Sequence, residues 1–496
     1  MRGAPNPQAP DWDALAGAVS GEVVLPGSPG YETARRPAIA RFEDARPRAV
    51  VLCETPGDVS GAISFARRYG LRAAPRSGGH CFAGRSSTGD VVVDVSPMRS
   101  VSVSGGVATI GAGAPLGDVY DALDGHGLTV PAGCGPEVGI SGLTLGGGLG
   151  ILGRLHGLTS DNLLAARVVL ADGRAVWCDE DREPDLFWAL RDAGGGLFGV
   201  VTSLVFRAVP APAATAFRLI WPLDQAAEVV AAWQAWSPAG PDELAASLLL
   251  TAPDDPAVSP EVNVFGAMMG TESNTREPLE DLVARVGAEP ASASLEHASY
   301  RETKRYLADH GPGEDRPGGH QLNKSEFFRR PLPPGAVEAL VENFSEGRVA
   351  GQSRVLDFTP WGGAYNRVPA EATAFAHRGE LFLLLHLAVV GPEASAAEAQ
   401  EARRWLGRSW ASVRPWGTGR VYPNFPDPDL DGWARAYHGE NLERLARIKQ
   451  RYDPDNFFRF PQSVPGHVAA VAGRDDVESP PEDPPKGRGE RGDGDL

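Results

Sequence analysis

The sequence is poor in cysteine, and this excludes several classes of protein. Its 496 residues contain only four cysteines, Cys53, Cys81, Cys134 and Cys178, without a Cys-x-x-Cys pair or the spacing of zinc ligands. We therefore expect neither a disulfide framework nor a metal site. Cys53 and Cys178, on apolar strands, and Cys81 are expected to pack as small hydrophobic side chains.

Long apolar runs are absent as well. The most apolar stretch, residues 381–390, is too short to cross a bilayer and suits a buried strand. Residues 1–12 lack the apolar centre of a signal peptide, and no apolar segment follows the Arg35-Arg36 pair. We expect a cytoplasmic protein without a membrane partner.

Positive charge is scarce. The 47 basic side chains are outnumbered by 64 acidic ones, which gives a formal net charge of −17. Nucleic acids and anionic membranes would repel such a chain at long range, so its ligands should be small molecules. The hydrophobic fraction of 42% is typical of a globular protein. The chain is too long for one core and should form roughly two to four domains.

The first half of the chain predicts a domain that begins with a β-α-β unit. A strand at 49–52 leads to a helix that opens at Thr55-Pro56-Gly57-Asp58 and ends before Gly70, and residues 71–75 return as a strand. Further strands are predicted at 91–95, 100–103 and 107–111 as an antiparallel meander, at 163–170 and 175–178 around an Asp-Gly turn, and at 200–208.

The cluster Pro210-Ala211-Pro212 is the predicted domain boundary. Beyond it, an antiparallel sheet with helices on one face is expected, which makes the fold class α+β. Its predicted strands are 216–221, 246–251, 262–269 and 381–390, and its predicted helices are 224–236, 277–286, 336–343 and 394–413. The predicted parts are an irregular lead-in (1–44), a first domain (45–212), a second (213–420), a closing segment (421–465) and a disordered tail (466–496).

Two glycine-rich stretches stand out as candidate ligand loops. Arg76-Ser77-Gly78-Gly79-His80 follows a strand, so its backbone can turn tightly against a ligand and present an imidazole. The stretch 130–150 places the thiol of Cys134 between glycines and interleaves glycine with apolar residues, which favours a segment wrapped around a ligand over a linker.

One motif in this region points elsewhere. Gly148-Leu149-Gly150-Ile151-Leu152-Gly153 satisfies G-x-G-x-x-G, and Asp172 lies where the acid of a dinucleotide fold would follow. A Rossmann site needs an apolar strand directly before the glycines, whereas residues 142–147 are rich in glycine. We therefore reject a nicotinamide site.

These stretches together resemble a known family. The blocks Arg76 to His80, Gly133-Cys134 with residues 138–150, and Asp161-Asn162-Leu163 are similar to those of berberine bridge enzyme-like flavin oxidases, within the vanillyl-alcohol oxidase / p-cresol methylhydroxylase superfamily. Agreement extends to residues 361–365, His377-Arg378, 422–425, 437–441, 452–458 and Gln462-Ser463. The resemblance implies a p-cresol methylhydroxylase-type, two-subdomain FAD-binding domain, an α+β substrate domain, and a closing segment that returns to the FAD domain.

The resemblance also implies how FAD is held. His80 would bond to the 8α-methyl carbon of the flavin and Cys134 to ring position 6, while the glycine-rich backbone would receive the pyrophosphate as an anion nest. Taken alone, His80 would be a turn residue and Cys134 a buried small hydrophobe. The implied cofactor-binding residues are Arg76, Ser77, Gly78, Gly79, His80, Cys134, Val138, Gly139, Ser141, Gly142, Leu145, Gly146, Gly147, Gly148, Gly150, Asn162, Val200, Asn456 and Gln462.

A third glycine-rich stretch, residues 194–199, resembles another glycine block of the family. It departs from the family pattern at two positions, because Asp192 and Leu197 stand where we expect Gly and Asn.

Catalytic residues are implied at the C-terminal end. Tyr422 would take the hydroxyl proton while hydride leaves the substrate carbon, provided that a neighbour lowers its pKa from about 10. Asn424 would orient Tyr422 or the substrate, and Phe425 replaces a tyrosine common in the motif. Tyr365 is a second candidate base, although both tyrosines could instead be packing aromatics. His377 and Arg378 are expected to anchor a strand.

The resulting hypothesis is an FAD-dependent oxidase that takes hydride from an alcohol carbon of a sugar or secondary metabolite to flavin N5, with O₂ as acceptor and H₂O₂ as product. The alternatives are a flavin dehydrogenase with another acceptor or an oxidative cyclase at a C–N or C–C centre, and a flavin-binding protein without catalysis.

Overall fold

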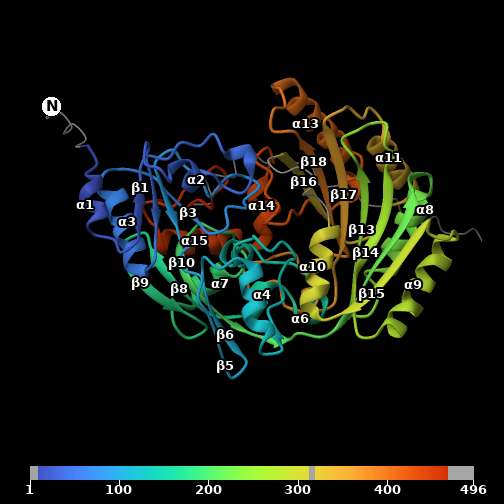
Figure 1. Ribbon diagram of the computed structural model, residues 1–496, viewed down its shortest axis with the longest axis horizontal. Coiled ribbons are helices and arrows are strands. Elements are labelled where there is room, and N and C mark those ends of the chain that lie inside the picture. The colour runs from blue at the N-terminus through green and yellow to red at the C-terminus, as the bar shows by residue number, and fades with distance from the viewer. Residues whose placement is uncertain (1–8, 312–318, 467–496) are drawn as a thin grey trace, which may run out of the picture.

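Figure 1 shows the computed structural model, which describes residues 9–311 and 319–466. The first part of the chain and its last described segment form a lobe with two larger sheets, and the residues between them form a single large sheet. The predicted disordered tail lies outside the described residues, apart from Gly466. Within the described ranges, no helix is both long and apolar enough to cross a membrane.

The first sheet of the two-sheet lobe has the strand order β1-β2-β4-β3. Its strands are β1 (Glu22–Val24), β2 (Ala49–Leu52), β3 (Ala73–Arg76) and β4 (Val91–Asp94). The predicted β-α-β unit is confirmed, and α3 (Pro56–Arg68) begins with a capping box between Thr55 and Asp58. Two expectations were wrong: β4 lies parallel between β2 and β3 rather than in a meander, and the lead-in supplies β1 to this sheet.

The second sheet is antiparallel, in the order β5-β6-β10-β8-β9. Asp172 and Gly173 form the predicted turn between β8 and β9, where Gly173 has φ +84°. The strands are β5 (Val101–Ser104), β6 (Val107–Gly111), β8 (Leu163–Leu170), β9 (Ala175–Cys178) and β10 (Gly199–Arg207). A short pair, β7 (Leu128–Thr129) with β11 (Val209–Pro210), lies apart from it. The lobe's helices are α1 (Trp12–Ala16), α2 (Tyr31–Arg35), α4 (Leu116–Asp124), α5 (Ile140–Leu145), α6 (Gly153–His156) and α7 (Pro184–Leu190).

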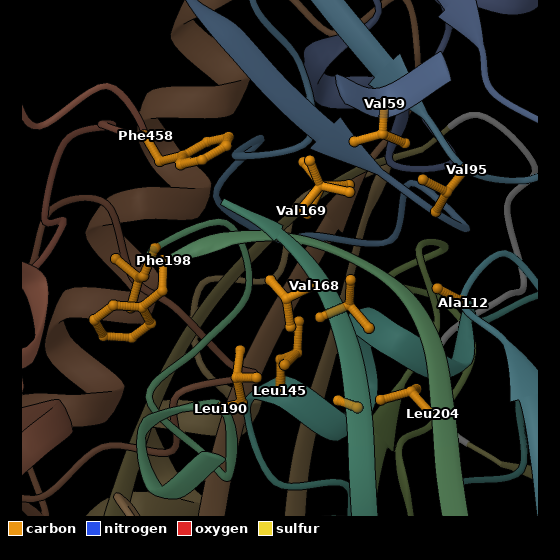
Figure 2. Close-up of a cluster of buried hydrophobic side chains, with 14 of the residues drawn as sticks. Val59, Val95, Ala112, Leu145, Val168, Val169, Leu190, Phe198, Leu204 and Phe458 are labelled. Carbon is orange, nitrogen blue, oxygen red and sulfur yellow. The ribbon is translucent and has the colours of Figure 1, made fainter. Parts of the chain in front are cut away.

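A hydrophobic core joins both sheets of this lobe to the end of the chain (Figure 2). Val59 of α3 and Val168 of β8 belong to it together with Phe458 from the C-terminal segment. The helices α14 (Trp433–His438) and α15 (Leu442–Tyr452) precede Phe458, and α15 contributes Leu445 and Ile448 to the same core. The predicted return of the closing segment to the first domain is confirmed.

The large sheet has seven antiparallel strands in the order β15-β12-β14-β13-β17-β18-β16. They are β12 (Ala214–Pro222), β13 (Leu244–Ala252), β14 (Glu261–Met269), β15 (Ser292–Ala298), β16 (His320–Phe328), β17 (Gln352–Pro360) and β18 (Phe382–Val390). Four of these strands were predicted, whereas β15, β16 and β17 were not.

Helices cover the outer face of this sheet (Figure 1), as predicted. They are α8 (Ala226–Trp236), α9 (Glu272–Val286), α11 (Pro334–Ser345) and α13 (Ala396–Ala411). Helix α10 (Tyr300–His310), which was not predicted, packs instead with inner-face residues such as Val355 and Leu387, together with Ile151 and Leu152 of the two-sheet lobe. A short helix, α12 (Ala364–Arg367), follows β17.

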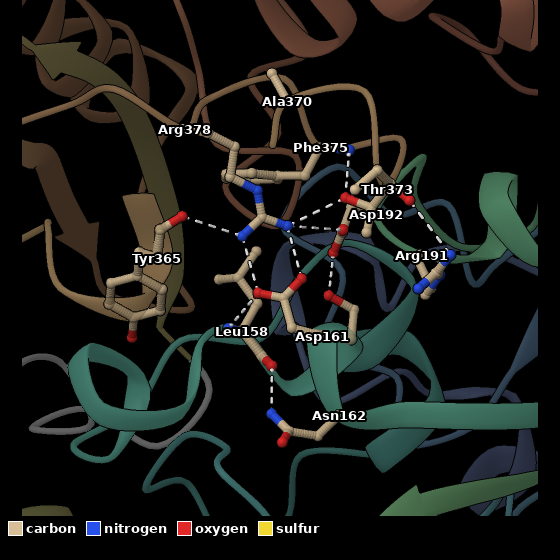
Figure 3. Close-up of polar contacts among 12 residues, drawn as sticks. Leu158, Asp161, Asn162, Arg191, Asp192, Tyr365, Ala370, Thr373, Phe375 and Arg378 are labelled. Carbon is tan, nitrogen blue, oxygen red and sulfur yellow. Dashed lines mark hydrogen bonds and ion pairs between the residues drawn. The ribbon is translucent and has the colours of Figure 1, made fainter. Parts of the chain in front are cut away.

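A buried arginine connects the two halves (Figure 3). The guanidinium of Arg378 donates to both carboxylate oxygens of Asp161, at 2.7 and 2.8 Å, and lies 3.8 Å from Asp192. Asp192 also accepts a hydrogen bond from Ser160. Burial raises the pKa of Asp192 to about 7, against the opposing effect of Arg378. The φ of Asp192, +95°, lies in the region of backbone conformation that favours glycine.

We predict that Arg378→Met strongly destabilises the protein. The substitution leaves Asp161 and Asp192 buried without their cation, at a cost of about 3–5 kcal/mol in the free energy of unfolding. Chemical denaturation followed by tryptophan fluorescence measures this cost. Arg367→Met is the matched control, because its 2.7 Å ion pair with Asp242 is largely exposed and should contribute less than about 1 kcal/mol. Equal losses in the two variants would contradict the prediction.

Candidate active site

A cavity of about 620 Å³ lies where the glycine-rich loops meet the large sheet and the C-terminal segment. Residues from 75–82, 138–149 and 194–201 line it on one side, and Gln321 and residues 422–426 line it on the other. Among the described residues that line it are Arg76 and Arg85 but no Asp or Glu. The guanidinium of Arg76 is occupied by the carbonyl oxygens of Ala34, Arg35 and Ser86, so Arg85 and the absence of acids are what suit the lining to an anionic ligand.

The two predicted ligand loops touch through their backbones. A Cβ on Gly78 would lie 2.4 Å from the Gly139 nitrogen, and a Cβ on Gly139 would lie 2.2 Å from Ser77 Oγ. Gly79 adopts φ +74°, which glycine tolerates without cost. Only glycine allows this approach, and the approach places both loops at one cavity.

Most of the predicted cofactor residues line this cavity. The structure brings together Arg76, Ser77, Gly78, Gly79, His80, Val138, Gly139, Ser141, Gly142, Leu145, Gly148 and Val200. His80 Nδ1 lies 2.8 Å from the Gly78 carbonyl oxygen, which orients the ring. Residues 140–145 form helix α5, although the glycine content of the stretch predicted no regular element.

Cys134 does not line the cavity, although its neighbour Gly133 does. Its sulfur lies 3.7 Å from the Nζ of Lys304, on the side of helix α10. The prediction that His80 and Cys134 face one ligand is therefore met by His80 alone in this geometry. Cys81, which was expected to pack in the core, lines the cavity instead.

Asn162, Asn456 and Gln462, which were also predicted to bind the cofactor, do not line the cavity. Asn162 donates to the carbonyl oxygens of His156 and Leu158, and Gln462 accepts from Arg85 and donates to the Asp427 carbonyl. Both residues therefore support the loops around the site. Asn456, with φ +49°, lies in the turn after α15.

Tyr422 and Asn424 line the cavity, where they contact the second glycine-rich loop. The Tyr422 hydroxyl oxygen accepts hydrogen bonds from the Gly148 N–H at 2.8 Å and from Asn424 Nδ2 at 3.3 Å. Asn424 also donates to the Leu143 carbonyl at 2.8 Å. The role of Tyr422 as a base was conditional on a lowered pKa, and burial raises the pKa of Tyr422 by more than these two donors lower it.

Two glycines make room for Tyr422 and Asn424. A Cβ on Gly146 would lie 2.1 Å from Asn424 Oδ1, and one on Gly147 would lie 3.0 Å from the Tyr422 hydroxyl. Gly146 and Gly147 do not line the cavity themselves. Their predicted contact with the cofactor stays a prediction, and in the structure they give Asn424 and Tyr422 the space to approach.

Tyr365, the second candidate base, lies away from the cavity. Its hydroxyl lies 3.3 Å from the Gly150 nitrogen and 3.2 Å from the Gly150 oxygen, and its ring stacks on Trp361 at 4.4 Å. Burial raises its pKa to about 12. The amides of Gly148 and Gly150 are thus bonded to tyrosines, and those of Gly146 and Gly147 donate to the carbonyl oxygens of Leu143 and Thr144.

Some lining residues were not predicted. Gln321 reaches the cavity from β16, and Phe82 and Phe425 line it with ring centroids 5.9 Å apart. One signal could have identified β16. Small or uncharged polar residues (Gln321, Asn323, Ser325) alternate with larger residues along it, which is the period of two that strands show.

The cavity fits FAD. A Cβ on Gly142 would meet no atom within 4 Å, so a side chain there would take up cavity space that glycine leaves open. Gly194, Gly195 and Gly196 widen the same wall, and the lining combines backbone amides, two arginines and apolar side chains. This combination suits a long ligand with an anionic middle and a flat apolar ring system.

Two family models match the chain. The FAD binding domain model covers residues 47–179, which include both glycine loops, and the berberine and berberine like model covers residues 421–465, which include Tyr422 and Asn424.

Relatives match over most of their length. The FAD-linked oxidoreductase YgaK of Bacillus subtilis is 33% identical over 90% of this chain and 97% of its own. The structure of berberine bridge enzyme-like 1 from Physcomitrella patens has a TM-score of 0.82, with 28% identity, over 92% of this chain and 98% of its own. The xylooligosaccharide oxidase of Myceliophthora thermophila, in complex with xylobiose, has a TM-score of 0.81, with 28% identity, over 92% and 99% of the two chains.

The match to YgaK and the two family models agree with the cavity, in which the FAD-binding loops meet the C-terminal tyrosine. The chain therefore belongs to the berberine bridge enzyme-like family of FAD-linked oxidoreductases.

Proposed function

We propose that this protein is an oxidase that removes hydride from an alcohol carbon of a sugar or secondary metabolite and passes the electrons to O₂, with H₂O₂ as product. One observation carries the proposal: the buried Tyr422 and the half-buried Asn424 line the same cavity as the glycine-rich loops. An alcohol bound there would lie between a hydride acceptor and a proton acceptor. FAD, when bound, supplies the hydride acceptor.

Tyr422 is the proposed base. Loss of hydride from a carbinol carbon must be accompanied by transfer of the hydroxyl proton, and the Tyr422 oxygen lies at the cavity wall. The N–H groups of Gly148 and Asn424 both point at this oxygen, so they would stabilise the phenolate that accepts the proton and offset part of the rise in pKa that burial causes. The contacts of Asn424 with Leu143 hold that amide in place. Tyr365 is given a supporting role, because its hydroxyl is bonded to Gly150.

The sugar class is favoured by two observations. A xylooligosaccharide oxidase is among the solved structures of similar fold, and the cavity wall on the large sheet presents the amide of Gln321. Amide side chains donate to and accept from sugar hydroxyls. A dehydrogenase with another electron acceptor, or a cyclase acting at a C–N or C–C centre, would use the same FAD loops and differ in the second substrate.

We also propose that FAD is attached covalently, through His80 and through Cys134. His80 already lines the cavity. The bond through Cys134 requires that its side chain turn from Lys304 toward the cavity.

Peroxide formation tests the reaction class. The purified yellow protein is mixed with a panel of mono- and oligosaccharides and secondary alcohols in air, and H₂O₂ is measured with a coupled peroxidase. The proposal expects peroxide with at least one hydroxyl donor. Bleaching of the flavin without peroxide would favour a dehydrogenase, and a flavin that no donor bleaches under anaerobic conditions would favour a binding protein.

We predict that His80→Ala abolishes covalent attachment at position 80. After denaturation and removal of free flavin, the wild-type polypeptide should retain the mass of one FAD, and digestion should place it on the peptide that contains His80. The variant should lose flavin from this peptide. Cys81→Ala, which alters the next cavity-lining residue, is the matched control and should keep the flavin. A colourless denatured wild type would refute covalent attachment.

We predict that Tyr422→Phe slows reduction of the flavin by an alcohol substrate about 10²- to 10⁴-fold, the usual contribution of a general base. The measurement is anaerobic stopped-flow bleaching of the flavin absorbance. Tyr365→Phe is the control, since its hydroxyl is bonded to Gly150 away from the cavity, and it should change the rate less than about tenfold. A larger loss in Tyr365→Phe than in Tyr422→Phe would exchange the roles of the two tyrosines.

A further inference from the structure

Arg85 is the cation of the cavity lining that no acid of the described chain neutralises. It lines the cavity just after the first glycine-rich loop, and it takes part in none of the ion pairs between described residues. The other arginine of the lining, Arg76, already donates to three backbone carbonyl oxygens and lies 4.0 Å from Asp94. The charge of Arg85 is therefore the one that this wall can offer to a ligand.

Most of the hydrogen-bonding capacity of Arg85 is unused. A guanidinium carries several N–H donors, and the described residues accept from it once, where Nη2 lies 3.1 Å from Gln462 Oε1. Its Nε is buried and has no acceptor within residues 9–311 and 319–466. A buried donor without an acceptor costs free energy, and a ligand in the cavity can supply the missing acceptor.

Three side chains of the C-terminal segment hold the Arg85 guanidinium. Its central carbon lies 4.6 Å from the ring centroid of Phe460 and 5.8 Å from that of Tyr437. Gln462 donates to the Asp427 carbonyl, and the Tyr437 hydroxyl accepts from the Asp427 N–H. The segment that completes the cavity therefore also positions this cation.

Phe460 places the cation beside the glycine wall. A Cβ on Gly196 would lie 3.8 Å from Phe460 Cε1 and equally far from Pro75 Cδ. Gly196 and Pro75 both line the cavity, in the two stretches of the two-sheet lobe that flank it. The ring on which Arg85 stacks therefore lies at the wall that faces the cofactor.

The backbone of the second glycine-rich loop offers few donors to an anion. The N–H groups of Gly146, Gly147, Gly148 and Gly150 are all bonded within the protein, although this stretch was expected to form an anion nest. The diphosphate carries the negative charge of FAD at neutral pH. A guanidinium in a partly buried wall attracts such an anion strongly, because little water screens the two charges.

We propose that Arg85 binds the diphosphate of FAD and supplies the positive charge of the cofactor site. Its unused N–H groups would donate to phosphate oxygens, while Phe460 and Gln462 keep the plane of the guanidinium fixed. The inference concerns FAD binding and requires neither the proposed alcohol oxidation nor a covalent bond. A failed peroxide assay would leave it standing.

The affinities for FAD and riboflavin test the assignment. They are measured by isothermal titration calorimetry on the full chain with His80→Ala and Cys134→Ala, in which neither covalent bond can form. Arg85→Met, added to this background, removes the charge and keeps a long side chain against Phe460. We expect it to weaken FAD binding about 10- to 100-fold and to leave the binding of riboflavin, which has no phosphate, unchanged. Unchanged FAD affinity, or an equal loss for both flavins, would overturn the inference.

The chain with His80 and Cys134 intact provides a second measurement. After expression and purification, the share of polypeptide that carries flavin is read from the ratio of flavin to protein absorbance. Arg85→Met should show a smaller share than the unsubstituted chain. An equal share would overturn the inference even if the double variant binds no flavin.

Arg67→Met is the matched control. Arg67 also stacks on a ring of the C-terminal segment, Phe457 at 5.6 Å, and pairs with Asp455, but it does not line the cavity. Its loss removes one positive charge and one contact with that segment, and the FAD affinity and flavin share should not change. A loss equal to that in Arg85→Met would overturn the specific role of Arg85.

An acidic substrate is the other possible source of an anion. Glucuronate and glucose are therefore titrated into the holoprotein while the visible flavin spectrum is recorded. The proposal expects Arg85→Met to leave any difference between the two sugars unchanged. Unchanged FAD affinity together with selectively weakened binding of glucuronate would assign Arg85 to the substrate and overturn its assignment to the cofactor.

Discussion

The site depends on a close contact between two backbones. Gly78 and Gly139 are separated along the sequence by β4, the pair β5–β6 and α4, yet a methyl group on either would collide with the other loop. This contact places the imidazole of His80 beside the glycine-rich wall. The C-terminal segment then completes the cavity, because the Tyr422 hydroxyl accepts the Gly148 N–H. Each feature of the proposed chemistry follows from these two contacts.

The sequence predicted the parts of the fold that are governed by local rules. The capping box at Thr55 and Asp58 fixed the start of α3, and Asp172-Gly173 fixed the β8–β9 hairpin. The prediction from sequence failed where strands that follow one another along the chain are not adjacent in the sheet. Strand β4 reads like the strands that follow it, but it is buried on both faces between two parallel partners. Strand β16, which contributes Gln321 to the cavity, lacks an apolar run before Phe327 and was missed.

Among site residues, the sequence predicted that the glycine-rich loops and Tyr422 belong to the site, but not which glycines line the cavity and which contact Tyr422 and Asn424. Gly146 and Gly147 make space for Asn424 and Tyr422. Arg378 was expected to anchor a strand, and it also holds two acids of the other half. The contact between Cys134 and Lys304, which lies 170 residues away, could not be predicted. Such long-range contacts have no signature in local patterning.

The late position of Tyr422 in the chain has a consequence for biosynthesis. Domains of a growing chain tend to fold in the order in which they leave the ribosome. Here the glycine wall emerges first, and the Gly148 amide can meet the Tyr422 hydroxyl only after the more than 270 residues between them have been made. The glycine loops can thus be assembled before the residue that completes the cavity wall is present.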